Sequence, residues 1–197
     1  MFQTAPGVVI PFPERIAEEY QLLEGGAICA NISYEHLRAV VDEFYRALPE
    51  PLFFVLQLPL TRQEELQLGD GGVLHQEVLY LDGQTQAQID AIMKDYGQLL
   101  LGDGMSQFAI ASHQNDDEIF VQKYKIVTIY SKTPEKYSPI LEKYGLRKTD
   151  DIATVWSTFS HSSPGECHKI SVDGLDAYAV ADILKTRGMY RAKVIDE

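Results

Sequence analysis

The sequence has few cysteines and few basic residues, and no apolar run long enough to cross a membrane. Its 197 residues include only two cysteines, Cys29 and Cys167, too few for a fold held together by disulfides. The first twenty residues lack the basic flank and long apolar run of a secretory signal, so a cytoplasmic location is expected. The most apolar stretch, at 51–60, has the length of a strand and contains Pro59, so no membrane anchor is predicted.

Positive charge is scarce and unevenly placed. The chain has 29 Asp and Glu against 17 Lys and Arg, a net charge of −12, which disfavours nucleic acid and anionic membranes as partners. Residues 1–100 carry 15 acids and 5 bases, whereas residues 101–197 carry 14 acids and 12 bases. A solvated surface explains this pattern simply. The alternative is an acidic face, formed by the first half, that meets a basic partner.

Nucleotide-binding motifs are also missing. Neither GxGxxG nor GxxxxGK occurs, and the glycine-rich loops at 69–72 and 102–104 lead into predicted strands, the wrong order for a phosphate cradle. Leu-Gly-Asp-Gly occurs twice, at 68–71 and 101–104. We predict that both copies turn the backbone, with Gly71 and Gly104 at positive φ. Replacing Asp70 or Asp103 by asparagine should then be mild.

No complete set of metal ligands can be assembled locally. His75 and Glu77 would share one face of a strand, but a deaminase-like zinc site needs a second cysteine after Cys167, which is absent. A half-exposed strand is the simpler interpretation of that pair. The acidic run 115–118 is interpreted as a solvated hairpin tip. The sequence thus predicts no resident metal and no cofactor.

Periodicity and capping signals predict an α+β fold. The expected architecture is a single domain over 1–197, a mixed, largely antiparallel sheet with four main helices packed on it; a two-part arrangement would divide near 102–105. Capping residues and apolar stripes predict helices over 33–48, 85–102, 133–145 and 173–188, with a short helical turn from Thr61. Strands are predicted over 52–58, 73–81, 106–112, 118–131, 154–160 and 190–195.

One polar cluster is the strongest enzyme candidate. His161, Glu166, Cys167 and His168 fall within eight residues of each other and offer a thiol, a base and a carboxylate. Neighbouring residues on an extended chain point apart, so proximity in sequence does not establish contact. The alternative is a serine-rich loop with a half-buried thiol and no catalytic role. The sequence leaves open whether the chain is an enzyme and favours the interpretation that it is not.

Three classes of function remain. The first is a non-enzymatic acidic protein-binding module, of the immunity or inhibitor type, that engages a basic partner through an acidic face marked by Glu64, Glu65 and Asp70. Eleven tyrosines favour such an interface, and small acidic α+β inhibitors of basic enzymes are an analogy of class, without a motif match. The others are a thiol- or metal-assisted enzyme using the 161–168 cluster, and a self-associating structural protein that forms homo-oligomers.

Overall fold

A broad sheet with helices on one side organises the molecule. The computed structural model describes residues 2–69 and 72–196, which form five α-helices and eleven β-strands. Nine strands make one sheet in the order β11-β5-β4-β6-β7-β8-β3-β2-β9, in which only β2 and β9 are parallel neighbours. The predicted α+β class and largely antiparallel sheet are therefore confirmed, with one helix more than the four main ones expected.

The elements have the following bounds. The helices are α1 (Tyr34–Arg46), α2 (Arg62–Leu68), α3 (Gln86–Gly102), α4 (Ser138–Lys143) and α5 (Ala177–Thr186). The strands of the large sheet are β2 (Glu19–Leu23), β3 (Ala27–Asn31), β4 (Leu52–Pro59), β5 (His75–Gln84), β6 (Gln107–Ser112), β7 (Glu118–Val121), β8 (Val127–Tyr130), β9 (Arg147–Lys148) and β11 (Tyr190–Asp196). A separate antiparallel pair is made by β1 (Val8–Val9) and β10 (Glu166–Cys167).

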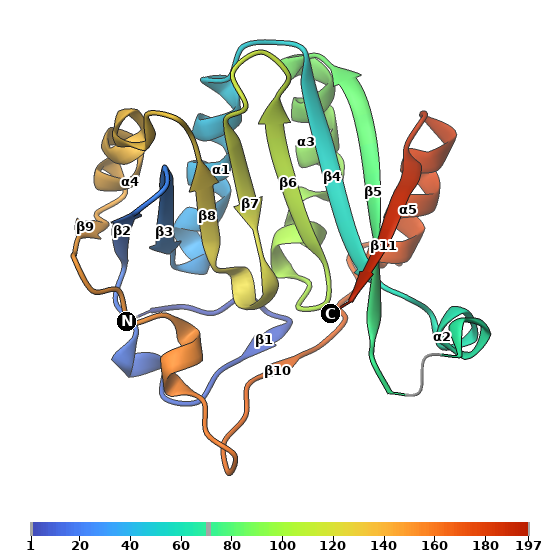
Figure 1. Cartoon of the computed structure of the whole chain (residues 1–197), viewed down its shortest axis with the longest axis horizontal. Helices are drawn as coiled ribbons and strands as arrows, with labels where there is room; N and C mark the ends of the chain where they lie inside the picture. The colour runs from blue at the N-terminus through green and yellow to red at the C-terminus, as the bar shows by residue number, and fades with distance from the viewer. Residues whose placement is uncertain (1, 70–71, 197) are drawn as a thin grey trace.

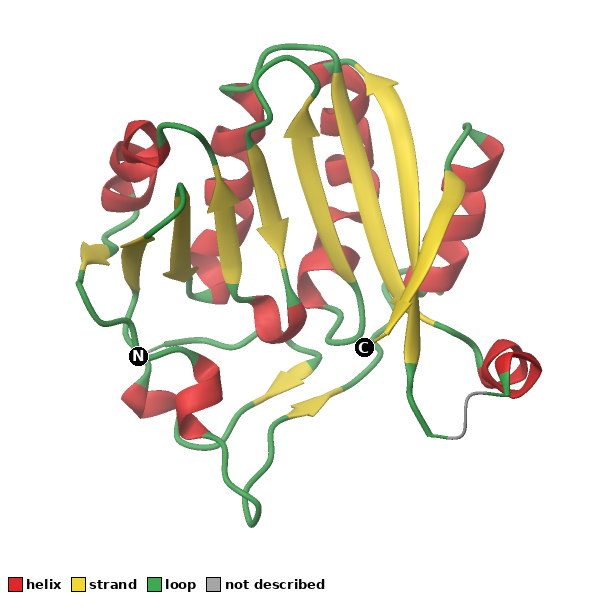
Figure 2. Ribbon diagram, in the orientation of Figure 1, coloured by secondary structure: helices red, strands yellow, loops and turns green. Residues whose placement is uncertain are grey.

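The two faces of the sheet differ. Helices α1, α3 and α5 lie behind it in Figure 1, and no α-helix of the described residues crosses the face toward the viewer (Figure 2). Strand β4 shows the alternation that produces this arrangement. Phe54 and Leu56 are fully buried in the core beneath the helices, whereas Phe53 and Gln57 are half-buried on the opposite side. We call that opposite side the open face.

Two of the predicted helix caps, at Thr61 and Thr85, form their side-chain hydrogen bonds, whereas those at Ser33 and Thr133 do not. Thr61 and Thr85 each form a capping box with the residue three positions on, as predicted. Ser33 precedes α1 but does not cap it, because its hydroxyl accepts a hydrogen bond from the Gln3 amide. Helix α5 begins after Asp176, later than the predicted residue 173, because the Asp176 carboxylate accepts from the Ala179 amide and so fixes the first turn.

Several strand predictions need correction. The segment 154–160 is not a strand: Val155–Thr158 form a 3₁₀ helix, and Val155 is buried in a small second apolar cluster with Ile16 and Ile126. The segment 118–131 is two strands, β7 and β8, separated by a turn in which Tyr124 and Lys125 both have φ of 59°. Strands β2 and β3 were not predicted. Their hairpin turns at Gly25 and Gly26, both at positive φ.

The second Leu-Gly-Asp-Gly copy lies where three backbone segments cross. The Gly7 amide donates to the Gly102 carbonyl at 2.7 Å, the Gly104 amide to the His168 carbonyl at 3.0 Å, and the His168 amide to the Gly7 carbonyl at 2.8 Å. Gly104 is not among the glycines at positive φ, so that expectation is wrong; its role is close approach of backbones. Gly71 lies outside the described residues.

Asp103 connects this crossing to the core. Its carboxylate is buried and accepts from the amides of Met105, Ser106 and Ile170 at 2.7–3.0 Å. Lys125, also buried, donates from Nζ to the carbonyls of Leu100 and Ser106, which closes the end of α3. Burial lowers the pKa of Lys125 to about 8, and the Asp103 charge opposes that shift.

The sheet uses strands from both halves of the chain. Strand β5 pairs with β11 from the far end of the chain, and β3 pairs with β8, so neighbours in the sheet come from both sides of residues 102–105. Within the part of the chain that the structure describes, no helix is long and apolar enough to cross a membrane.

Candidate protein-binding face

A row of aromatic rings crosses the upper part of the open face. Phe53 stacks on Tyr80 with ring centroids 5.9 Å apart, and Tyr80 stacks on Tyr190 at 6.4 Å. His113 extends the row, 4.7 Å from Phe53. Tyr190, at the end of the row, is fixed by Asp82, because the Tyr190 hydroxyl donates to the Asp82 carboxylate at 2.7 Å. Tyr190 is nevertheless 49% exposed, so the row presents its edge to solvent.

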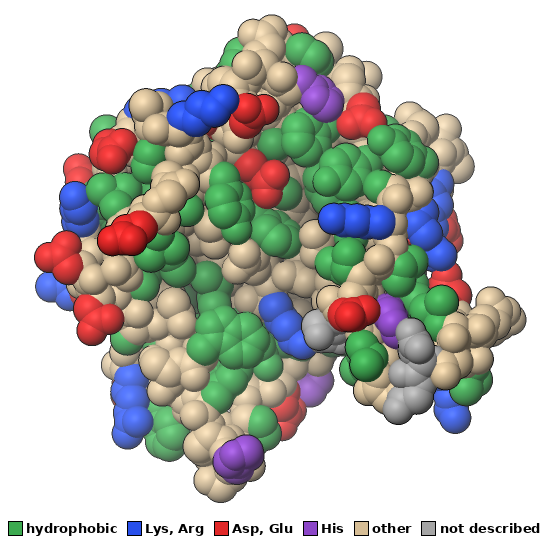
Figure 3. All heavy atoms as spheres, in the orientation of Figure 1, with side chains coloured by type: hydrophobic (Ala, Val, Ile, Leu, Met, Phe, Trp, Pro, Cys, Tyr) green, Lys and Arg blue, Asp and Glu red, His purple; other side chains and the backbone are tan. Residues whose placement is uncertain are grey.

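Small apolar residues fill the middle of the open face. Val55, Val78 and Ala109 are buried there and form a third cluster that is separate from the main core. Phe120 and Ile195 pack against this cluster while remaining half-buried. Figure 3 shows that hydrophobic side chains gather on this face, with only isolated charges among them. The sheet therefore has apolar residues on both sides, unlike a sheet with one solvated face.

The lower end of the open face is hollowed. A pocket of about 690 Å³ lies between the sheet and the loops below it. Its floor carries glutamine side chains, in which Gln107 donates to Gln76 at 2.9 Å and Gln57 is its neighbour on β4. Trp156, which is 52% exposed, and Phe120 also line it. Amide groups beside exposed aromatic rings can accept a polypeptide surface.

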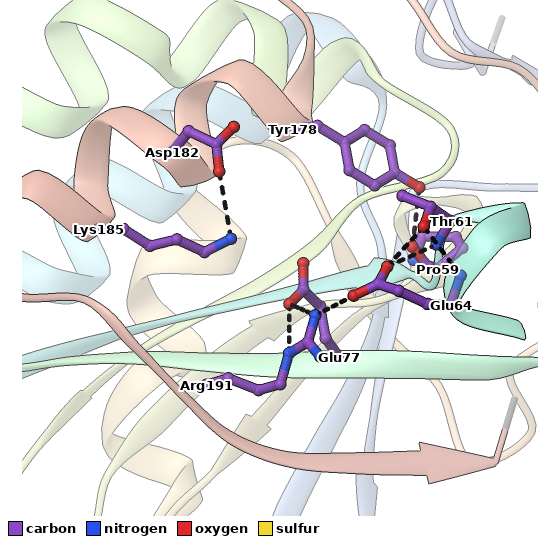
Figure 4. A network of polar contacts seen from close by, with 8 residues as sticks. All are labelled: Pro59, Thr61, Glu64, Glu77, Tyr178, Asp182, Lys185 and Arg191. Atoms are coloured by element: carbon purple, nitrogen blue, oxygen red, sulfur yellow. Dashed lines mark hydrogen bonds and ion pairs between the residues drawn. The ribbon is translucent and has the colours of Figure 1, made fainter. Parts of the chain in front are cut away.

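The two carboxylates expected to form an acidic face have internal partners. Glu64 contacts Arg191 at 2.5 Å and also closes the capping box at Thr61, as Figure 4 shows. Arg191 reaches the buried Glu77 at 2.6 Å in the same network. Glu65 accepts from both the amide and the ring of His75, at 2.7 and 2.8 Å. Both carboxylates therefore form hydrogen bonds and ion pairs within the fold. Asp70, the third residue of the expected acidic face, lies outside the described residues.

This network surrounds a second cavity. A pocket of about 640 Å³ lies between α5 and the β4–α2 connection, lined by equal numbers of acidic and basic side chains. Tyr178 donates to the Pro59 carbonyl at its wall, and burial, followed by nearby acidic charges, raises the pKa of Tyr178 to about 12. The Lys169 ammonium sits 4.1 Å from the centre of that ring. Because acidic and basic side chains line this pocket in equal numbers, little net charge remains to select a charged ligand.

The Glu64 contacts predict a loss of stability in acid. Hydrogen bonds from Arg191, and then from Thr61, lower the pKa of Glu64 to about 2, below the roughly 4.3 of an unfolded chain. The stabilisation is therefore present above about pH 4.3 and is lost as the pH falls toward 2. We expect Glu64→Gln to lower the free energy of unfolding at pH 7, and by roughly half as much at pH 3, which lies between the two pKa values. Urea unfolding of both chains at the two pH values measures this, and an equal deficit at both would contradict it.

The proposed enzyme cluster is partly scattered. His161 is exposed on a loop, while His168 and Glu166 contact each other at 3.0 Å with both side chains more than half exposed. Cys167 lies between them on β10, where alternation directs its side chain to the other side of the strand. Burial raises the pKa of its thiol, which works against a reactive thiolate.

Other predicted polar groups act within the fold. His75 and Glu77 are buried, 6% and 4% exposed, so the expected half-exposed strand is wrong: α2 and the Arg191 side chain cover them. Asp117 is also buried, since the hairpin tip packs on Lys136 and Tyr137, both of which donate to it. The rest of that tip is exposed or half-exposed.

Among the described residues, one group of side chains has the spacing of metal donors. Atoms of Glu18, Glu35 and His36 lie within 4.8 Å of one another at the start of α1. Glu18 already accepts from the Ser33 amide at 3.0 Å and from the His36 ring at 2.9 Å. These contacts explain the cluster as a helix cap.

Comparisons with known proteins add no relative. No family model matches the chain, and no curated protein and no solved structure matches it. The fold and the site define its class: an α+β protein whose antiparallel sheet is covered by helices on one face and carries exposed aromatic side chains on the other.

Sequence reasoning missed the open face. Its exposed residues, Tyr190, Tyr130 and Trp156, come from distant parts of the chain, and no motif joins them. The stretch 52–58 did contain one signal. In a strand with one solvated face, alternate residues are polar, but Phe53 and Val55 occupy those positions here and are apolar.

Proposed function

We propose that the chain is a non-enzymatic, acidic protein-binding module that engages a basic partner through its open face. The observation that supports this most strongly is the aromatic row of Phe53, Tyr80 and Tyr190, exposed at Tyr190, on a sheet face that no α-helix of the described residues covers. Tyrosine and tryptophan are enriched in protein interfaces because they combine a large apolar area with a hydrogen-bonding group and few rotatable bonds.

The charge of the chain favours a basic partner. The net charge is −12, and several of its cations are paired to acidic side chains from distant positions: Lys143 to Glu43, Arg147 to Glu19, and Arg191 to Glu64. These pairs neutralise part of the acidic first half, so the excess charge is spread over the molecule. Such a field accelerates the approach of a cationic protein, and burial of aromatic side chains then slows its dissociation.

Self-association through pairing of the edge strand β11 has less support than binding of a partner on the open face. Strand β11 is an edge strand, but its pairing with β5 is irregular between Arg191 and Lys193, and both of these residues are charged. Bulges and charged side chains are features that protect an edge against pairing with another chain. The open face is thus the better surface for a partner.

Truncation of the aromatic row tests the proposal. We expect Tyr190→Ala to weaken association with a captured basic partner by about 2 kcal/mol, roughly 30-fold in Kd, because an exposed interface aromatic is lost. Partners are recovered on the immobilised chain from an extract of its source, and affinities are measured by calorimetry at low and high salt.

Leu66→Ala provides the matched control. Leu66 is 74% exposed on α2, away from the aromatic row, so its truncation should leave the affinity unchanged. Equal effects of the two substitutions, or partners that are acidic or nucleic acid, would contradict the proposal. So would a partner that is only a second copy of the chain.

A further inference from the structure

The open face contains one carboxylate that has no partner within the described chain. Glu118 begins β7 and lies opposite Ala111 on β6 and Tyr130 on β8. It is half-buried, and none of the hydrogen bonds or ion pairs among the described residues involves its carboxylate. Desolvation alone raises the pKa of Glu118. In a chain where Glu64, Glu65, Glu77, Asp103 and Asp117 all have donors, this isolation is unusual.

The surroundings of Glu118 are apolar and aromatic. Phe120 lies two residues along the same strand and therefore on the same face, and Tyr130 lies directly across on β8, 43% exposed. Burial, followed by the charge of its cross-strand neighbour Glu118, raises the pKa of the Tyr130 hydroxyl. On the other side, Ala111 and Phe53 are the next residues across the sheet.

A carboxylate flanked by aromatic rings fits a guanidinium group. The planar guanidinium is weakly hydrated, stacks on aromatic faces and donates two parallel hydrogen bonds to a carboxylate. An ammonium is more strongly hydrated and loses more on entering an apolar surface. On the β6 side of Glu118, Ala111 is only 1% exposed, so an incoming guanidinium would approach from the side of Tyr130, which is 43% exposed.

We propose that Glu118 receives an arginine side chain of the basic partner, held against Tyr130 and Phe120 on the open face. This inference rests on the proposed function, because it names the chemical group by which that partner is recognised. Without the arginine, Glu118 is a half-desolvated charge that the free chain tolerates at a cost in stability.

That cost gives a test that needs no partner. Glu118→Gln keeps the shape of the side chain and removes the charge, so we expect it to raise the midpoint of thermal unfolding by about 2 °C or more at pH 7. Asp95→Asn, at an exposed position in the middle of α3, makes the same change of charge and should leave the midpoint nearly unchanged. A lower midpoint for Glu118→Gln would show that the carboxylate is satisfied within the fold and would overturn the proposal.

Binding supplies the second test. Nα-acetyl-arginine amide is titrated into the isotopically labelled chain, and the Glu118 carboxyl carbon and the Ala109 and Ala111 methyl groups are followed by NMR. We expect saturable shifts with arginine and none with the neutral citrulline analogue, and at least a tenfold weaker response in Glu118→Gln than in Asp95→Asn. Equal shifts from both ligands, or no difference between the variants, would overturn the proposal.

The captured partner separates this inference from the proposed function. If Tyr190→Ala weakens binding while Glu118→Gln does not, the open face binds the partner but Glu118 does not receive its arginine. If neither substitution weakens binding, both proposals fail. A loss of about 30-fold or more on Glu118→Gln alone, with Asp95→Asn unchanged, supports the assignment of Glu118.

Discussion

Gly104→Ala is expected to lower the free energy of unfolding by about 3 kcal/mol, close to the upper end of ordinary overpacking effects. A Cβ atom at residue 104 would lie 2.0 Å from the Gly7 carbonyl oxygen and 2.8 Å from the His168 amide nitrogen. These two atoms are the acceptor and the donor of the hydrogen bond that joins the N-terminal segment to the residue after β10, and Gly104 itself donates to the His168 carbonyl. The crossing can accept a methyl group only if these segments separate. Denaturant unfolding of the two chains measures the loss.

Gly145→Ala is the matched control. Gly145 has φ of 84°, and a Cβ there would meet nothing within 4 Å, so only the backbone conformation is strained. That strain is worth about 1 kcal/mol. If both substitutions cost the same, the close approach at Gly104 contributes nothing and the proposed reason for its glycine is wrong.

Asp103→Asn is expected to cost about 2 kcal/mol, although the sequence alone suggested a mild effect. One carboxylate oxygen accepts from Met105 and Ser106 while the other accepts from Ile170. Asparagine has a single acceptor oxygen and would turn its amide hydrogens toward at least one backbone donor in a buried site. It would also remove the negative charge near the buried Lys125.

Asp182→Asn shows what the same change does at the surface. Asp182 contacts Lys185 at 3.2 Å with its side chain 76% exposed, and such pairs contribute little, so the loss should stay within about 0.5 kcal/mol. Unfolding free energies of both variants test the contrast. An Asp103→Asn chain as stable as the parent would mean that the three backbone amides find other acceptors.

Local signals in the sequence predicted much of the fold. The capping boxes at Thr61 and Thr85 are formed, because a cap involves residues only three positions apart. The hairpin expected between 106 and 131 exists as β6 and β7. The segment around Val155 was wrongly predicted to be a strand. Its apolar residues pack against the N-terminal segment, and a contact between parts so distant in sequence leaves no local pattern.

The candidate site depends on distant pairings, and for that reason the sequence did not reveal it. The order of strands places β11 beside β5, which brings Tyr190 onto Tyr80 across more than a hundred residues. The same strand pairing brings Arg191 next to Glu64. The resulting ion pair neutralises a carboxylate that the sequence analysis assigned to an acidic face. A count of charges along the chain cannot anticipate which of them are paired in the fold.

Footprinting of a complex tests the central claim most directly. The chain is labelled with hydroxyl radicals, alone and bound to its captured basic partner, and the modified side chains are quantified by mass spectrometry. The open-face assignment predicts strong protection of Tyr190, Tyr130 and Phe120, with labelling of the exposed Leu66 on α2 unchanged. Protection confined to the helix-covered side of the sheet, with Tyr190 and Tyr130 labelled as in the free chain, would contradict it.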